Sequence, residues 1–316
     1  MSTLTISAIQ TNLHWEDKSA NLQMLEQKIS SIKEKTEIVV LPEMFSTGFS
    51  MKTETLAETM EGETLQWMKR IAAEKKIILT GSFICRGAES DLVDKTVQAA
   101  ESDRADKTVQ TAESDLTDKT VQAAESDLAD KTVQAASSGP TRYYNRLIWM
   151  QPNGQYGVYD KRHCFAFAGE DEHYTAGTKR LIASVKGWKI NLLICYDLRF
   201  PVWARQTPGD AAEYDVLIYV ANWPERRIHA WKTLLQARAI ENQCYVVGTN
   251  RVGDDGNNIH YSGESMIVDP LGEVLYTKKE EEDIFTITLD KTHLQTVRDK
   301  FPFLRDADDF KMITDR

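Results

Sequence analysis

The chain has 316 residues, a formal net charge of −10 and four cysteines. Most of the negative charge falls in one repetitive segment, so the near-neutral remainder gives no electrostatic reason to expect nucleic-acid binding. No apolar run is long enough to cross a membrane, the first residues lack the plan of a signal peptide, and the cysteines are too sparse for a disulfide scaffold. We therefore expect a reduced, cytoplasmic protein that does not bind membranes.

The first part of the chain alternates strand and helix patterns. Residues 4–13 predict a strand, and residues 21–35 predict a helix with apolar side chains on one face. Residues 37–45 predict a short buried strand, residues 63–76 a second helix and residues 77–85 a further strand. This alternation favours a sheet that is covered by helices.

A tandem repeat follows this region. A twelve-residue unit, AESDLADKTVQA with variants, occurs four times between Ala88 and Ala135. Twelve residues advance an α-helix by about 1,200°, so an apolar stripe rotates by about 120° from copy to copy and gives no continuous buried face. We expect a solvated, flexible insertion, with a short β-solenoid or a partner-binding arm as the alternative. The flanking patterns, residues 77–85 and 141–154, would then form one hairpin.

The second half of the chain continues the same mixture. Residues 188–201 predict a near-continuous apolar strand that breaks at Cys195, and residues 214–224 predict another that breaks at Asn222. A helix is predicted over residues 227–243, followed by strand patterns and by a terminal helix that stops at Pro302. We predict one α+β domain over residues 1–316, interrupted by the repeat at 88–135.

Three reactive residues lie at or near strand ends. Glu43 follows the run VVLP, Cys195 follows NLLI, and Lys161 lies in VYDKRH. Catalytic groups in α/β sheets collect beyond the carboxyl ends of strands, where a thiol could attack, a carboxylate could take its proton and an ammonium could stabilise an oxyanion. Taken singly, Cys195 could instead be a small core residue, Glu43 a helix cap and Lys161 a surface charge.

Several blocks of the sequence resemble the nitrilase superfamily of carbon–nitrogen hydrolases. The signature blocks are LPEMF, YDKRHCF and ICYDLRFP, in this order, and the match extends through ANWP and through Gly263-Glu264-Ser265. The resemblance covers essentially the whole chain outside the repeat. It implies an αββα sandwich that pairs with a second subunit into four layers, hence a homodimer, with no metal and no organic cofactor.

The resemblance also implies roles for individual residues. Glu43 would be the general base, Lys161 the oxyanion stabiliser and Cys195 the nucleophile that forms a thioester. A nearby lysine would also favour the thiolate form of the cysteine. The superfamily uses a second glutamate after the lysine, and spacing favours Glu170 over Glu172.

Within the superfamily, the blocks are most similar to bacterial ω-amidases, which hydrolyse the side amides of 2-oxo acids such as 2-oxoglutaramate and 2-oxosuccinamate. The backbone N–H of Tyr196 would complete the oxyanion site. Arg199 could anchor an anionic substrate, or it could pair with Asp197 and fix the turn. Four aromatic residues could wall the pocket or pack in the core: Phe45, Phe49, Tyr144 and Trp223. The alternatives are another amidase or nitrilase specificity, and an inactive scaffold protein that binds partners through the repeat.

Overall fold

The computed structural model describes residues 2–87, 141–206, 212–308, 310 and 312. Its strands are β1 (Thr3–Gln10), β2 (Ile38–Val40), β3 (Ile78–Gly87), β4 (Arg142–Met150), β5 (Tyr156–Asp160), β6 (Leu181–Val185), β7 (Trp188–Ile194), β8 (Val216–Ala221), β9 (Tyr245–Asn250), β10 (Val252–Asp254), β11 (His260–Val268), β12 (Val274–Lys279) and β13 (Asp283–Asp290). The repeat, with its predicted flexibility, lies outside the described residues.

The α-helices are α1 (Lys18–Ser30), α2 (Thr53–Leu56), α3 (Glu63–Lys75), α4 (Glu170–His173), α5 (Pro201–Ala204), α6 (Ile228–Asn242) and α7 (Lys291–Lys300). Short 3-10 helices include η2 (Ala166–Ala168), η3 (Cys195–Arg199), η4 (Glu225–Arg227) and η5 (Phe303–Asp306). Among the helices of the described ranges, none is long and apolar enough to cross a membrane.

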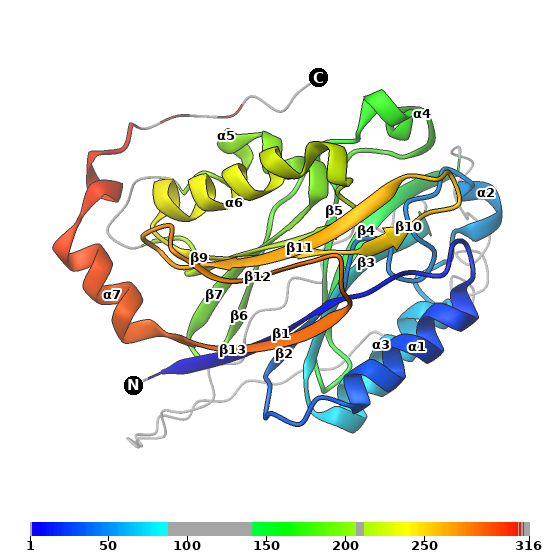
Figure 1. The fold of residues 1–316 in the computed structure, drawn as a ribbon, viewed down its shortest axis with the longest axis horizontal. Coiled ribbons are helices and arrows are strands. Elements are labelled where there is room, and N and C mark those ends of the chain that lie inside the picture. The colour runs from blue at the N-terminus through cyan, green and yellow to red at the C-terminus, as the bar shows by residue number, and fades with distance from the viewer. Residues whose placement is uncertain (1, 88–140, 207–211, 309, 311, 313–316) are drawn as a thin grey trace, which may run out of the picture.

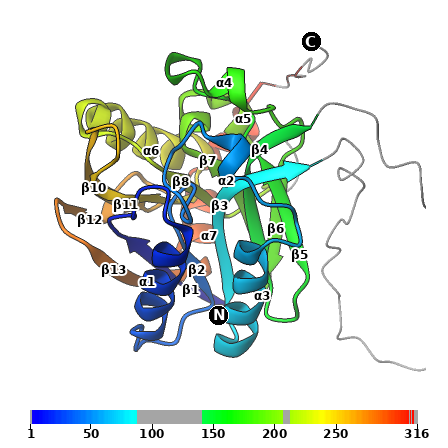
Figure 2. The same cartoon turned by 90° about the vertical axis from the view of Figure 1, so that its right-hand side faces the viewer.

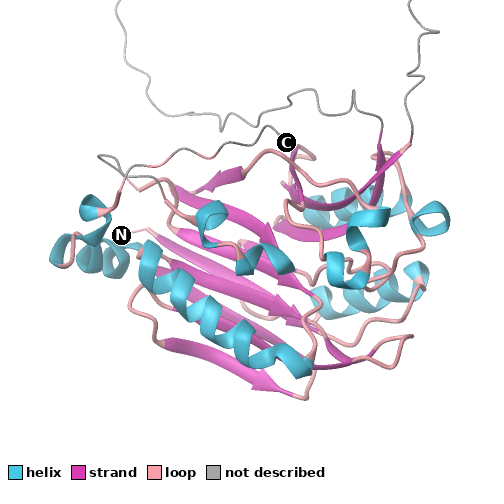
Figure 3. Cartoon of the chain, turned by 90° about the horizontal axis from the view of Figure 1, so that it is seen from above, coloured by secondary structure: helices cyan, strands magenta, loops and turns pink. Residues whose placement is uncertain are grey.

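The strands form two sheets. One has the order β13-β1-β2-β3-β4-β5, and the other has the order β10-β11-β9-β8-β7-β6, with β12 also paired to β11. Helices α1 and α3 lie together on the outer side of the first sheet, and α6 covers the outer side of the second (Figure 1). Seen from above, α6 is the long helix in front of the strands (Figure 3). This is the αββα sandwich that the resemblance implied.

Alternation along the strands explains the two buried layers. In β2, Ile38 and Val40 join the core between the two sheets, whereas Val39 faces the core beneath α1 and α3. In β3, Ile78 and Leu79 divide in the same way. Successive side chains of a strand point to opposite faces, so an apolar run without polar interruptions supplies both layers. The near-continuous apolar strands of the sequence follow from this sandwich.

The two strands that flank the repeat form the predicted hairpin. β3 and β4 pair antiparallel from Leu79 opposite Met150 to Gly87 opposite Arg142. They lie side by side in Figure 2, where α3 and α2 contact β3. β2 and β3 are parallel, so Gly87 lies at the same edge of the sheet as the carboxyl end of β2.

Some predicted boundaries were wrong. The first helix begins at Lys18 rather than at residue 21, because the Asp17 side chain accepts a hydrogen bond from the Ala20 N–H and caps it there. It ends at Ser30, five residues before the predicted end, where the Ser31 hydroxyl bonds to the Lys28 carbonyl oxygen. The breaks at Cys195 and Asn222 are confirmed, since β7 ends at Ile194 and β8 at Ala221.

Candidate functional site

Four of the predicted residues meet at one edge of the sandwich. Lys161 and Cys195 directly follow β5 and β7, Glu43 follows β2 after a short turn, and Glu170 begins α4. Glu43 and Glu170 are 0% exposed, Lys161 is 1% and Cys195 is 8% exposed. Glu172, the alternative to Glu170, is exposed to solvent. Burial thus selects Glu170 as the second glutamate of this cluster.

Lys161 lies between the two carboxylates. Its Nζ donates to Glu43 Oε1 at 2.9 Å and to Glu170 Oε2 at 2.8 Å. Burial alone would lower the pKa of Lys161, but the charges of Glu170 and Glu43 outweigh it and raise this pKa well above the ordinary lysine value. The amine is therefore held as an ammonium in a buried site.

Two asparagines complete the hydrogen bonding of the carboxylates. Asn145 Nδ2 donates to Glu43 Oε1 at 2.8 Å and to Glu170 Oε1 at 3.2 Å. The Asn222 N–H donates to Glu43 Oε2 at 2.8 Å, and Asn222 Nδ2 donates to the Glu43 carbonyl oxygen at 2.7 Å. The sequence analysis did not assign a role to either asparagine. Each lies within or just after an apolar strand, and this position could have indicated a buried amide that needs hydrogen-bond partners.

Glu170 differs from an ordinary surface carboxyl group. Burial raises its pKa, the nearby charge of Glu43 raises it further, and Lys161 and the Phe165 N–H oppose this rise. The Phe165 N–H donates to Glu170 Oε2 at 2.5 Å. Two carboxylates therefore share one ammonium, with Glu170 locked against the segment that follows Lys161.

Cys195 occupies a strained turn between β7 and η3. Its φ of 43° lies in the left-handed region, which costs a non-glycine residue about 1–3 kcal/mol and is typical of functional positions. Its Sγ lies 3.9 Å from the Asn222 carbonyl oxygen. Burial and the charge of Glu43 raise the thiol pKa well above the ordinary value, although Lys161 opposes them. Lys161 thus favours the thiolate, as expected, whereas burial and Glu43 favour the thiol, so a base beside the sulfur would assist its ionisation.

Arg199 does not pair with Asp197. Asp197 is occupied by other donors, namely the Tyr159 hydroxyl at 2.7 Å, the Ile194 N–H at 3.0 Å and the His163 N–H at 3.0 Å. The Arg199 guanidinium carbon instead lies 4.9 Å from the centre of the Trp223 ring. The alternative in which Asp197 binds Arg199 and fixes the turn is therefore wrong.

The other predicted pocket residues divide between site and core. Phe49 borders the site, with Lys161 Nζ 5.3 Å from its ring centre. Trp223 directly follows Asn222, and the Tyr196 N–H lies in the first turn of η3. Phe45 joins the core beneath α3, where its ring lies 5.8 Å from that of Trp67. Tyr144 points to the face of β4 opposite to Asn145.

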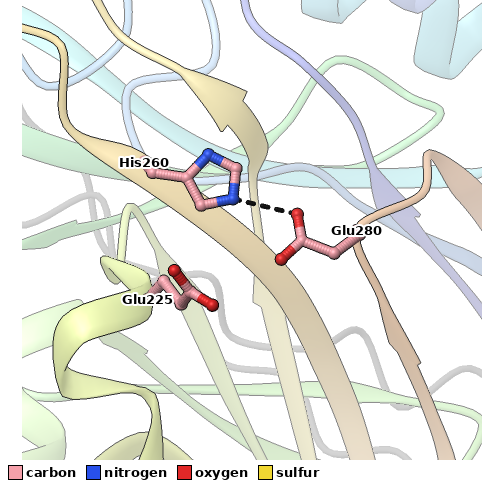
Figure 4. Close-up of side chains that lie close together, drawn as sticks. All are labelled: Glu225, His260 and Glu280. Carbon is pink, nitrogen blue, oxygen red and sulfur yellow. Dashed lines mark hydrogen bonds and ion pairs between the residues drawn. The ribbon is translucent and has the colours of Figure 1, made fainter.

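One cluster outside this site has the side chains of a metal site. Glu225, His260 and Glu280 offer three ligand atoms that lie within 4.8 Å of one another (Figure 4). Their side chains are 42–43% exposed, and Lys279 Nζ lies 3.3 Å from Glu225 Oε1. Asp254 accepts from His260 and raises its pKa. These ion pairs at the surface explain why the three side chains lie close together.

Comparison with known proteins agrees with the geometry of the buried cluster. The family model described as carbon-nitrogen hydrolase matches residues 5–110 and 93–299. An omega-amidase, YafV, from Yersinia enterocolitica is 35% identical over 99% of this chain and 100% of its own length. The 2-oxoglutaramate amidase of Bacillus subtilis is 27% identical over 96% of each chain.

A solved structure shares the fold as well as the sequence. XC1258 from Xanthomonas campestris, a CN-hydrolase superfamily protein with an arsenic adduct in its active site, is 34% identical and superposes with a TM-score of 0.79. The similarity covers 99% of this chain and 100% of that one. The chain described here therefore belongs to the carbon–nitrogen hydrolase, or nitrilase, superfamily, and it is an amidase that acts on small-molecule amides.

Proposed function

We propose that this amidase hydrolyses the side amide of small 2-oxo acids, such as 2-oxoglutaramate and 2-oxosuccinamate, through a thioester on Cys195. The observation that carries the proposal is the contact of Lys161 with both Glu43 and Glu170 beside a buried thiol. The omega-amidase and 2-oxoglutaramate amidase relatives support the substrate class.

Acylation begins with proton transfer from the thiol. Glu43 takes the proton of Cys195 as the sulfur attacks the amide carbonyl carbon, because the raised pKa of the thiol leaves little free thiolate. The carbonyl oxygen becomes an oxyanion, which the Lys161 ammonium and the Tyr196 N–H stabilise. Glu43 then donates its proton to the amide nitrogen, so that ammonia leaves and a thioester remains.

Deacylation uses the same carboxylate in reverse. Glu43 takes a proton from a water molecule, and the hydroxide attacks the thioester carbonyl. Collapse of the second tetrahedral intermediate breaks the carbon–sulfur bond, and Glu43 returns the proton to sulfur. Glu170 remains bonded to Lys161 Nζ at 2.8 Å and keeps the ammonium in place through both halves of the reaction.

We further propose that the active unit is a homodimer. Two apolar side chains on α5 and α6 support this, because Val202 is 50% and Ile240 is 54% exposed. The resemblance to the nitrilase superfamily implies this pairing, and a partner would cover such exposed apolar side chains. Light scattering coupled to size-exclusion chromatography measures the mass in solution, and a monomer at micromolar concentration contradicts this part of the proposal.

Ammonia release from a panel of amides tests the function. The panel contains 2-oxoglutaramate, 2-oxosuccinamate, glutamine, asparagine and neutral aliphatic amides, each assayed with the wild-type chain and with Cys195→Ala. We expect the 2-oxo acid amides to give the highest kcat/KM and the variant to be inactive. Preference for a different amide contradicts the substrate class, and a wild-type chain that is inert towards the whole panel contradicts the catalytic proposal.

A further inference from the structure

The geometry points to Arg227 as a second substrate-binding cation, which acts with Arg199 to hold the carboxylate of the 2-oxo acid. This inference rests on the proposed function and adds to it the group that distinguishes anionic from neutral amides. The sequence analysis considered only Arg199 for this task.

The backbone places Arg227 close to the catalytic carboxylate. Arg227 ends η4, which follows Asn222 and Trp223 after Pro224. The Trp223 indole Nε1 donates to the Arg227 carbonyl oxygen at 2.8 Å. Asn222, one residue earlier, donates its N–H to Glu43 at 2.8 Å. The turn that carries Arg227 is therefore tied to the loop that holds the proposed base.

The side chain of Arg227 extends over a ring of the active site. Its guanidinium carbon lies 5.0 Å from the centre of the Phe165 ring. That ring lies 4.8 Å from the ring of Tyr196, the residue after the nucleophile, and the Phe165 N–H bonds to Glu170. Arg199 lies on the Trp223 ring in the same manner. Both guanidinium groups thus lie over aromatic rings that are tied to the buried cluster, since Phe165 bonds to Glu170 through its N–H and Trp223 directly follows Asn222.

The two arginines lack the carboxylate partners that others have. Arg146 pairs with Asp160 and Arg180 pairs with Glu213, whereas within the described ranges neither Arg199 nor Arg227 forms a salt bridge to a carboxylate. Both are partly buried. A partly buried cation without a counterion is poorly stabilised, and a bound anion would supply what is missing.

The electrostatic surroundings of Arg227 agree with a place near the thiol. Burial and the charges of Arg226 and Arg199 lower its pKa, and the Cys195 sulfur opposes them. Arginine stays protonated under such a shift, because its ordinary pKa is so high. The positive charges of the two guanidinium groups therefore repel each other, and a bound carboxylate beside them would offset this repulsion.

The chemistry of the ligand matches two guanidinium groups. A 2-oxo acid presents a carboxylate and an adjacent carbonyl oxygen, which are three acceptors in one plane. A guanidinium group offers parallel N–H donors that bind a carboxylate in a bidentate manner, a geometry that a lysine cannot reproduce. The site therefore favours amides that bear a carboxylate at the far end over neutral amides of the same length.

Steady-state kinetics with a matched pair of substrates tests this inference. We would compare 2-oxoglutaramate with its neutral methyl ester in the wild type, in Arg227→Gln and in Arg227→Lys. Arg226→Gln is the control, because it removes the same charge from an exposed neighbour. We expect Arg227→Gln to raise KM for the anion by about 10–100-fold, because a charge-assisted hydrogen bond to the substrate carboxylate is lost. The changes in kcat and in turnover of the ester should be much smaller. Arg227→Lys should recover only part of the loss, and Arg226→Gln should resemble the wild type.

The possible failures are distinguishable. If the wild type hydrolyses 2-oxoglutaramate and Arg227→Gln keeps its KM, the proposed function stands and the role of Arg227 is overturned. An equal loss for the anion and the ester also overturns it, because a general structural defect does not discriminate charge. If the wild type turns over neither 2-oxo acid amide, the proposed function fails and this inference fails with it.

Discussion

The buried cluster of the site and the pair formed by Arg199 and Arg227 differ in how their charges are compensated. Lys161, Glu43 and Glu170 are almost fully buried, and each is bonded to an opposite charge within the chain. Arg199 and Arg227 are partly exposed and rest on aromatic rings without a bonded carboxylate in the described ranges. The charges of the cluster are balanced within the chain before substrate binds. The two arginines, in the proposal above, receive their counter-charge from the carboxylate of the substrate. Changes in the cluster should therefore lower kcat, and changes in the pair should raise KM.

The largest effect is expected from Cys195→Ala, which removes the sulfur atom that is the proposed nucleophile. Amide hydrolysis should fall by at least about 10⁴-fold, since loss of a nucleophile abolishes the covalent route. An ammonia-release assay measures this, and Cys164→Ala is the control because, among the described residues, its sulfur donates to the Tyr174 carbonyl oxygen and not to a group of the cluster. Residual activity within tenfold of wild type would mean that another nucleophile operates.

Glu43→Gln should separate ionisation of the thiol from catalysis. The negative charge of Glu43 opposes thiolate formation and Lys161 favours it, so the neutral amide should lower the pKa of Cys195. Catalysis should nevertheless fall by about 10²–10⁴-fold, because the general base is gone. The rate of alkylation by iodoacetamide as a function of pH measures the first effect. A midpoint that stays in place or moves to higher pH contradicts the electrostatic account.

Asn145→Ala should lower kcat by about 10–100-fold and leave KM nearly unchanged. Asn145 donates to both carboxylates, and each such bond to a charged group contributes about 1.5–3 kcal/mol. Its loss should raise the pKa of Glu170 further, so the acidic limb of the kcat profile should move to higher pH. An effect on KM alone would place Asn145 with the arginines, as a substrate-binding residue.

Deletion of residues 88–135 should have the smallest effect on both the buried cluster and the two arginines. The β3–β4 pairing is complete up to Gly87 and Arg142 without any contribution from the repeat. We expect a folded variant with the wild-type kcat and KM, measured by thermal melting and by the same assay. An insoluble or inactive product contradicts this expectation, and a changed substrate range would make the repeat a lid of the site.

The sequence predicted the cluster better than its surroundings. Cys195 and Asn222 could be placed at strand ends because apolar runs stop there, and the order of the signature blocks implied that Glu43, Lys161 and Cys195 would meet. The pattern of residues could not say which side of a strand faces the site. For Phe45 the sequence therefore left open a place in the pocket wall or in the core, and the structure packs its side chain against Trp67. The distinction between Glu170 and Glu172 likewise depends on burial, which sequence spacing only suggests.

The least predictable contacts join distant segments through single hydrogen bonds. Asn145 donates to Glu43 from a strand that follows the repeat in sequence. A local sequence pattern cannot predict a contact between residues so far apart in the chain. The start of the first helix was also predicted wrongly. We expected the helix to begin at Asn21, but Asn21 is buried within it and donates to the Ser46 carbonyl oxygen, and Asp17 caps the helix further upstream.

The β3–β4 hairpin has a consequence for how this gene can change. Its two strands are still paired where the chain leaves at Gly87 and returns at Arg142. The entropic cost of closing a loop between two fixed ends rises with the logarithm of its length, by about 0.6 kcal/mol for each doubling. Slippage during replication that adds or removes a repeat unit would therefore be almost neutral for the enzyme. The same point is a natural place to graft an epitope or a reporter peptide.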